Sequence, residues 1–282
     1  MSRVDISAVW DRATEFLGDN LATLIPVAVP WIYLPLVVQS ALAPLTKTPG
    51  ALATGVQVAA FVLTLVGIWG QLQVLALAID RERGVAGARA GATAQFVPVI
   101  VNTLLFGLAA IVLVSPIGIA LGIAGIDVEA VMRASATGET IPRPPGMTPG
   151  IAIFILLYVV VLLVALLWIT ARFVLVNAVL LAEGGWFAAI SRSFALTRGR
   201  VLALVGVLLL FGIVSFVATL AAQTVFGAIF ALILGGEGPV TLASVLTASL
   251  VAIVSTAFTL LSAAFIGKYY VAARAQEAIG TA

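Results

Sequence analysis

Long apolar runs fill this chain from residue 21 to residue 270, and most of its charged residues fall in the short gaps between them. Only 9% of the residues are charged and 62% are hydrophobic, whereas an ordinary soluble domain contains roughly 25% charged residues. Insertion of a charged side chain at the centre of a membrane helix costs about 2.5–3.5 kcal/mol. Membrane spans are therefore expected to be long apolar runs without charges, as they are here. The sequence therefore predicts a polytopic membrane protein.

Six segments are long enough to cross a hydrocarbon core, which takes about 20 helical residues. Stretches such as LYVVVLLVALLWI are apolar on every side, which excludes the alternating strands of a membrane barrel. We predict an all-α helix bundle that forms a single integral membrane domain over residues 1–282. Its spans are expected near 21–42, 55–79, 98–123, 151–181, 201–222 and 240–270. Residues 222–236 either extend the fifth helix or lie as a short helix at the outer interface.

The basic residues are distributed unequally between the two sides of the predicted bundle. Eleven of the 14 fall on the side of the chain ends: Arg3, Arg12, Arg81, Arg83, Arg89, Arg172, Arg192, Arg198, Arg200, Lys268 and Arg274. Only Lys47, Arg133 and Arg143 fall on the other side. Because cytoplasmic segments retain Lys and Arg, both termini are predicted to be cytoplasmic, and residues 125–150 to form an external loop.

Histidine and cysteine are both absent. Their absence removes thiolate nucleophiles, disulfides, the commonest general base and the commonest transition-metal ligand. Asp80, Glu82 and Glu183 lie close to a membrane boundary, where capping and pairing with arginine are their ordinary roles. We therefore predict no catalytic residue, no metal site and no cofactor. The net charge of +2 is too small to indicate a nucleic-acid partner.

An offset of 101 residues aligns two parts of the chain. It brings Gln71 onto Arg172, Glu82 onto Glu183 and Gly84 onto Gly185. In both parts a span ends in an acid and a glycine, and a short amphiphilic stretch leads into the next span. The amphiphilic N-terminal stretch fits the same scheme, which predicts a three-fold hairpin repeat with cytoplasmic amphipathic elbow helices.

The clearest elbow is GGWFAAISRSFALTRGR. Its aromatic and aliphatic residues recur every four positions and would enter the acyl boundary, while Arg192, Arg198 and Arg200 would meet lipid phosphates. The alternative is a structural elbow whose arginines only anchor the topology.

The elbow and the span before it, residues 172–199, carry a set of residues that resembles a known family. These residues are Glu183, Arg192, Ser193, Leu196, Thr197 and Gly199. They resemble the membrane domain found with bacterial glycerophosphoryl diester phosphodiesterases and in YciC-like inner-membrane proteins. The resemblance implies a six-helix, multi-pass domain of the bacterial inner (plasma) membrane. It does not imply an enzyme, because the catalytic partner domain of that family uses essential histidines and clustered carboxylates, which this chain lacks.

Polar residues within the spans offer two interpretations. Arg172, Gln71 and Lys268 either form interhelical hydrogen bonds, with Lys268 reaching toward the cytoplasm, or line a cytoplasmic vestibule for an anionic headgroup.

These observations favour a non-enzymatic scaffold or lipid-interacting protein in envelope or phospholipid handling. The expected partners are membrane phospholipids, with a membrane or cytoplasmic protein as a further candidate. One alternative is a small-solute transporter or channel. Another is an accessory membrane domain for a separate soluble phosphodiesterase. The missing His and Cys disfavour an intramembrane enzyme.

Overall fold

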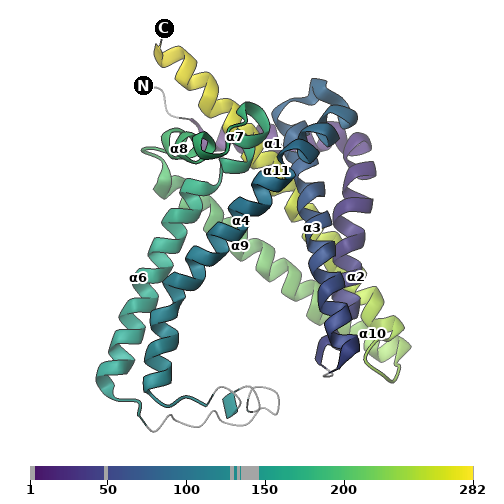
Figure 1. Ribbon diagram of the computed structural model, residues 1–282. Helices are drawn as coiled ribbons and strands as arrows, with labels where there is room; N and C mark the ends of the chain where they lie inside the picture. Colours follow the sequence, from purple (N-terminus) through teal and green to yellow (C-terminus); the bar gives the residue numbers. More distant parts are fainter. Residues whose placement is uncertain (1–3, 48–49, 128–129, 132–133, 135–145, 282) are drawn as a thin grey trace. The chain divides into compact units, whose positions relative to one another are not determined.

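The described part of the chain is all-α (Figure 1). The computed structural model describes every residue except 1–3, 48–49, 128–129, 132–133, 135–145 and 282. The helices are α1 (Ile6–Ala28), α2 (Leu34–Leu42), α3 (Ala51–Ile79), α4 (Gly84–Ile123), α6 (Pro149–Phe173), α7 (Val176–Glu183), α8 (Trp186–Leu196), α9 (Val201–Ala221), α10 (Gly227–Leu234) and α11 (Leu242–Thr281). Shorter turns are η1 (Val29–Tyr33), η2 (Ala43–Lys47), η3 (Arg81–Arg83) and η4 (Ala222–Phe226).

Six helical stretches in the described residues are long and apolar enough to cross a membrane. They are Ile6–Thr46, Ala51–Ile79, Arg81–Ile123, Pro149–Glu183, Val201–Leu234 and Leu242–Ile279. Large apolar side chains on them face outward, including Leu232, which is 87% exposed. Such surfaces need an apolar solvent. The prediction of an all-α polytopic bundle with six spans is confirmed, and the chain is a multi-pass membrane protein.

The fourth predicted span, 151–181, is confirmed as the stretch Pro149–Glu183, which is interrupted once by a short turn. Helix α6 ends at Phe173 and α7 begins at Val176. At the break, the Ser193 hydroxyl donates to the carbonyl of Arg172 at 2.6 Å. A polar side chain from α8 therefore satisfies a backbone group that the broken helix leaves open.

The fifth span continues past the predicted residue 222. A π turn, η4, connects α9 to α10, and the helical path ends at Gly235, which has φ of 56°. Helix α10 packs against α11. Residues 222–234 therefore extend the fifth helix, as the first of the two alternatives predicted.

Separate elbow helices form at only one of the three predicted places. The helix that begins at Ile6 continues through α1, η1, α2 and η2 to Lys47, and α4 runs from Gly84 to Ile123 without a break. Only α8 is a separate elbow, because Gly199, with φ of 76°, turns the chain after it. Gly84 and Gly185, which the 101-residue offset aligns, both have positive φ, 62° and 74°.

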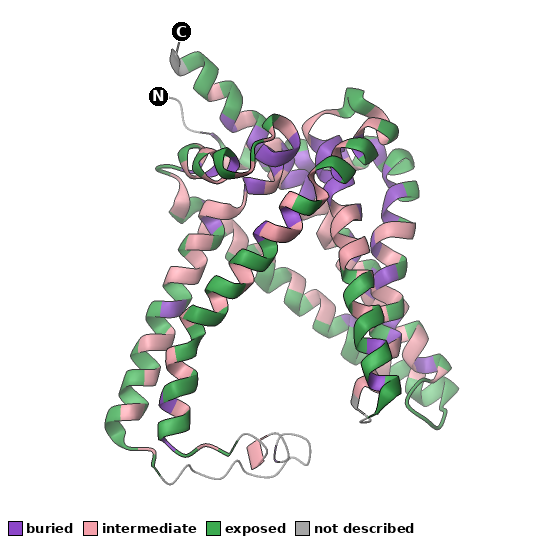
Figure 2. Ribbon diagram, in the orientation of Figure 1, coloured by how far each residue is buried: buried purple, intermediate pink, exposed green. Residues whose placement is uncertain are grey.

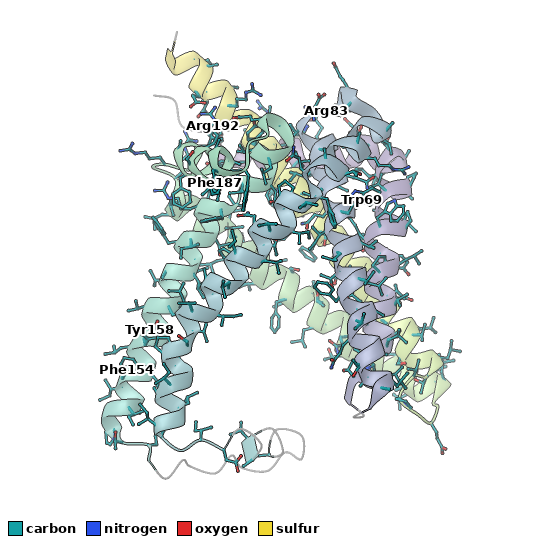
Figure 3. All side chains as sticks on the ribbon, viewed as in Figure 1. Trp69, Arg83, Phe154, Tyr158, Phe187 and Arg192 are labelled. Carbon is teal, nitrogen blue, oxygen red and sulfur yellow. The ribbon has the colours of Figure 1, made fainter. Side chains whose placement is uncertain are left out.

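The described chain divides into two compact units. Unit 1 comprises residues 1–99 and 172–282, and unit 2 comprises residues 100–171. In unit 2 the Tyr158 hydroxyl of α6 donates to the Leu113 carbonyl of α4 at 2.8 Å; Figure 3 labels Tyr158. The single integral domain over residues 1–282 stays a prediction. Arg3, Arg133, Arg143 and much of the predicted 125–150 loop lie outside the described residues.

Helix α11 is the centre of unit 1, where it packs against α1, α2, α3 and α10. Figure 2 shows that buried residues gather where α3, α7 and α11 meet. The start of α1 and the end of α11 also lie at this end of unit 1, near α7 and α8 (Figure 1). Two glycines of unit 1 allow neighbouring helical segments to approach each other closely. A β-carbon at Gly267 would lie 2.7 Å from that of Ala78, and one at Gly70 would lie 2.7 Å from that of Trp31.

We expect Gly267→Ala to lower the free energy of unfolding by about 1–3 kcal/mol, because the added methyl group forces α11 away from α3. Gly212→Ala is the control, since nothing lies within 4 Å of that position. It should leave the free energy unchanged or raise it by up to about 1 kcal/mol, because Ala favours helix over Gly. Unfolding of both variants in mixed detergent micelles measures the difference. Equal effects would contradict the close packing at Gly267.

Candidate functional site

Three helix ends meet in unit 1, beside the start of α1. They are the end of α3 with η3, the end of α7 with the start of α8, and the C-terminal part of α11. At η3 the Asp80 carboxylate accepts the backbone N–H of Glu82 at 3.1 Å. At the end of α7, Gly184 turns the chain with φ of 71°. Both breaks bring an acidic side chain to the same region: Asp80 lies between α3 and η3, and Glu183 is the last residue of α7.

Arg192 of α8 joins two acids that are distant in the sequence. Its Nε donates to Glu183 at 3.2 Å, and its two terminal nitrogens donate to the two carboxylate oxygens of Glu277 at 2.6 and 2.5 Å. The hydrogen bond to Glu277, assisted by the charge of Glu183, raises the pKa of Arg192 above its usual value. This paired arrangement, the Arg192 clamp (Arg192, Glu183 and Glu277), ties α8 to the ends of α7 and α11.

Two more side chains connect η3 and α11 to α7. The Tyr270 hydroxyl donates to the other oxygen of Glu183 at 2.6 Å. Arg83 pairs with Asp80 at 3.0 Å and donates from Nη1 to the carbonyl of Leu181 at 3.4 Å. Arg83 therefore satisfies a carbonyl in the last turn of α7, which has no partner within its own helix. Arg83 and Arg192 are labelled in Figure 3.

A pocket of about 460 Å³ opens between these helix ends. We call it the η3–α11 pocket; it is lined by Ile79, Asp80, Arg83, Ala182, Tyr270, Val271, Arg274, Ala275 and Ala278. Two guanidinium groups and one carboxylate line it, and the remaining surface is largely apolar. Arg274 forms no ion pair among the residues that the structure describes, and it interacts with the Tyr270 hydroxyl and with the charge of Glu277. The pocket thus combines excess positive charge with an apolar floor, which suits an amphiphilic anion.

The motif residues of the elbow mainly hold α8 in place. Ser193 and Thr197 are fully buried. Arg172 donates to the carbonyl of Phe194 at 2.8 Å and to the Thr197 hydroxyl at 3.4 Å, and its guanidinium lies 5.6 Å from the Phe194 ring centre. Arg172 therefore binds carbonyl and hydroxyl groups at the C-terminal end of α8. Leu196 is the last residue of that helix.

The remaining predicted site residues lie apart from one another. Arg200 donates to the side chain of Gln276 at 2.9 Å, and Arg198 is exposed. Gln71 is half-buried on α3, and the Lys268 ammonium lies 4.5 Å from the centre of the Phe16 ring of α1. The contacts of Arg172 and Lys268 described here therefore fall on different elements, α8 and α1. The vestibule formed by Arg172, Gln71 and Lys268 stays a prediction.

Tyr270, Arg274 and Glu277 were not predicted from the sequence to belong to a site. A usable signal was present, because these positions recur at intervals of four and three residues and so lie on one face of a helix. The predicted arginine pairing of Asp80 and Glu183 is confirmed by the pairs with Arg83 and Arg192. Within the described residues, no group of three His, Cys, Asp or Glu residues is placed to hold a metal ion.

The chain belongs to a family described as a domain of unknown function, DUF7847, whose model matches residues 10–273. No curated protein and no solved structure matches the chain. The resemblance to the phosphodiesterase-associated membrane domain stays a hypothesis that rests on the elbow motif.

We expect Ser193→Ala to lower the free energy of unfolding by about 1–3 kcal/mol, because it leaves the half-buried carbonyl of Arg172 without its hydroxyl partner. Ser191→Ala is the matched control on the same helix. The Ser191 hydroxyl is exposed and bonds only within α8, to the carbonyl of Ala188, so the change should stay within about 0.5 kcal/mol. Chemical unfolding in detergent tests both. If the two variants behave alike, Ser193 does not stabilise the α6–α7 break.

Proposed function

We propose that this protein is a non-enzymatic multi-pass protein of the bacterial inner membrane that binds phospholipid headgroups. In this role it acts as a lipid-interacting scaffold in envelope or phospholipid handling. The η3–α11 pocket is the observation that carries the proposal, because it combines two arginines and a single carboxylate with an apolar surface.

The charges of the pocket support an anionic headgroup. Arg83 is paired with Asp80, whereas Arg274 is exposed and has no ion pair within the described part of the chain. A guanidinium presents a planar set of donors that matches phosphate oxygens well. Arg274 is therefore the group that would bind a headgroup phosphate.

The apolar lining supports a lipid rather than a soluble anion. Ile79, Val271, Ala275 and Ala278 line the same pocket as the arginines. Burial of a methylene group contributes about 0.8 kcal/mol, so the first carbons of an acyl chain would add to the affinity of the phosphate.

The elbow helix α8 supports contact with the lipid surface at the same end of unit 1. Phe187 is 77% exposed and lies next to Trp186, with ring centres 4.8 Å apart. Aromatic rings of this kind concentrate at membrane–water interfaces. Exposed Arg198 on the following turn would meet headgroup phosphates.

We propose that this end of unit 1 is cytoplasmic, as the distribution of arginine and lysine predicts. Reporter fusions at residue 1 and residue 282 should both report a cytoplasmic location. A fusion within residues 135–145 should report the periplasm. A periplasmic signal from either chain end would overturn the orientation and move the proposed lipid site to the other leaflet.

A lipid-retention experiment tests the proposed function. Native mass spectrometry of the detergent-extracted protein should find more bound phospholipid than on an unrelated six-span bundle. Arg274→Gln should weaken the binding of anionic phospholipid by about tenfold, because a charge-assisted hydrogen bond contributes about 1.5–3 kcal/mol.

Arg89→Gln is the matched control, since Arg89 is an exposed arginine of α4 that does not line the pocket. It should retain lipid like the wild-type protein. Equal loss in both variants, or no retention above the unrelated bundle, would overturn the proposal. Flux of a small solute in reconstituted vesicles would instead favour the transporter alternative, and phosphodiester hydrolysis by the purified chain would contradict the non-enzymatic role.

A further inference from the structure

Helices α4 and α6 form an antiparallel hairpin in unit 2, and an apolar pocket of about 350 Å³ lies between them. We call it the α4–α6 groove; its lining includes Ile119 and Ile123 of α4 and Ile151 and Phe154 of α6. Every described residue that lines it is apolar. Ile119, Ile123 and Phe154 are also exposed. The groove is therefore open to whatever surrounds the hairpin.

Two contacts hold the helices together on either side of this groove. The Tyr158 hydroxyl of α6 donates to the Leu113 carbonyl of α4 at 2.8 Å. The Gly146 N–H, before the start of α6, donates to the Ala124 carbonyl, just after α4, at 3.0 Å. Along both helices the residues that line the groove fall between these two contacts. Figure 3 labels Phe154 of the groove and Tyr158 of the contact. The helices are thus fixed at both ends of the groove.

Small residues leave the space between the two contacts. The contacts set an antiparallel register in which Ala120 lies opposite Gly150. Both of these residues line the groove. Among the described residues, the atom nearest to a β-carbon added at Gly150 is the Thr148 hydroxyl oxygen, 3.9 Å away. A side chain placed at Gly150 would therefore enter open space.

The backbone beside the groove is already satisfied. Pro116 lines the groove and lacks the N–H that would bind the Val112 carbonyl within α4. The Ser115 hydroxyl donates to that carbonyl at 2.8 Å instead. A buried water needs about two to four polar partners, and the apolar lining residues do not supply them. The groove therefore suits a hydrocarbon ligand rather than water or a headgroup.

We propose that the α4–α6 groove binds one acyl chain of a membrane phospholipid. Both helices belong to the spans of a multi-pass membrane protein, so the groove is continuous with a lipid-facing surface. An apolar cavity of about 150 Å³ accommodates benzene, so the volume of the groove suits roughly a dozen carbons of a flexible chain. A chain in the groove contacts protein on several sides, whereas a chain on a single helix face contacts it on one. The additional dispersion contacts favour binding in the groove.

This site is separate from the proposed headgroup site. The α4–α6 groove lies in unit 2, whereas the η3–α11 pocket lies in unit 1, and they share no lining residue. The inference therefore stands if Arg274 binds no headgroup.

Photo-crosslinking tests the proposal on the full-length protein in vesicles of phosphatidylethanolamine and phosphatidylglycerol. The probe is a phosphatidylcholine that carries a diazirine in one acyl chain, and mass spectrometry of peptides locates its adducts. Gly150→Leu should reduce the adducts at Ile119 and Ile123 by about threefold, because the added side chain occupies the groove and removes dispersion contacts. Gly150→Ala adds one methyl group and should give a smaller reduction. It keeps the test valid if Gly150→Leu does not fold.

Gly118→Leu is the matched control on α4. Gly118 is exposed, a β-carbon added there has nothing within 4 Å, and the residue does not line the groove. This variant and Arg274→Gln should both give the adducts of the wild-type protein. Unchanged adducts in both Gly150 variants, or an equal reduction in Gly118→Leu, would overturn the proposal. A different apolar molecule, such as an isoprenoid, that co-purifies with the wild-type protein and is lost in Gly150→Leu would also overturn it.

Discussion

Lipid as the surrounding solvent imposes one constraint that shapes the whole chain: backbone hydrogen bonds must be satisfied inside the protein. Most of the structure meets this constraint with long helices. Where a helix breaks close to the membrane, a side chain takes the place of the missing helical bond. The Ser193 hydroxyl binds the Arg172 carbonyl beside the α6–α7 break, and Arg83 binds the Leu181 carbonyl near the end of α7. The polar residues near these breaks therefore have a structural reason to be present.

The same constraint explains why the charged residues gather at the ends of unit 1. Charges that lipid excludes from the spans are concentrated where α3, α7 and α11 end, and some of them are paired there. The Arg192 clamp and the Arg83–Asp80 pair neutralise two arginines. Arg274 forms no ion pair among the described residues. An anion-binding function would draw on this arginine, because an arginine already paired with a carboxylate has little affinity for another anion.

The elbow motif shows how one set of residues supports two interpretations at the level of sequence. Ser193 and Thr197 look like polar residues on an interfacial helix, yet both are fully buried and hold α8 against Arg172. Arg198 has the same appearance in the sequence but is exposed. The spacing of apolar residues predicted an elbow helix within residues 184–200, and α8 forms there over Trp186–Leu196. It did not separate the residues that fix the elbow from those that face the membrane surface, because burial depends on what packs against the helix.

The sequence by itself determined the solvent, the helical class, the number of spans and the placement of charges at their ends. These properties follow from transfer free energies, which sum over local stretches of chain. Only the tertiary structure decided where helices break, which arginines are neutralised, and which helix face of α11 lines a pocket. The bonds of Arg192 to Glu277 and of Arg83 to Leu181 join residues 85 and 98 positions apart. No local pattern specifies such partners, because they meet only when the helix ends pack together.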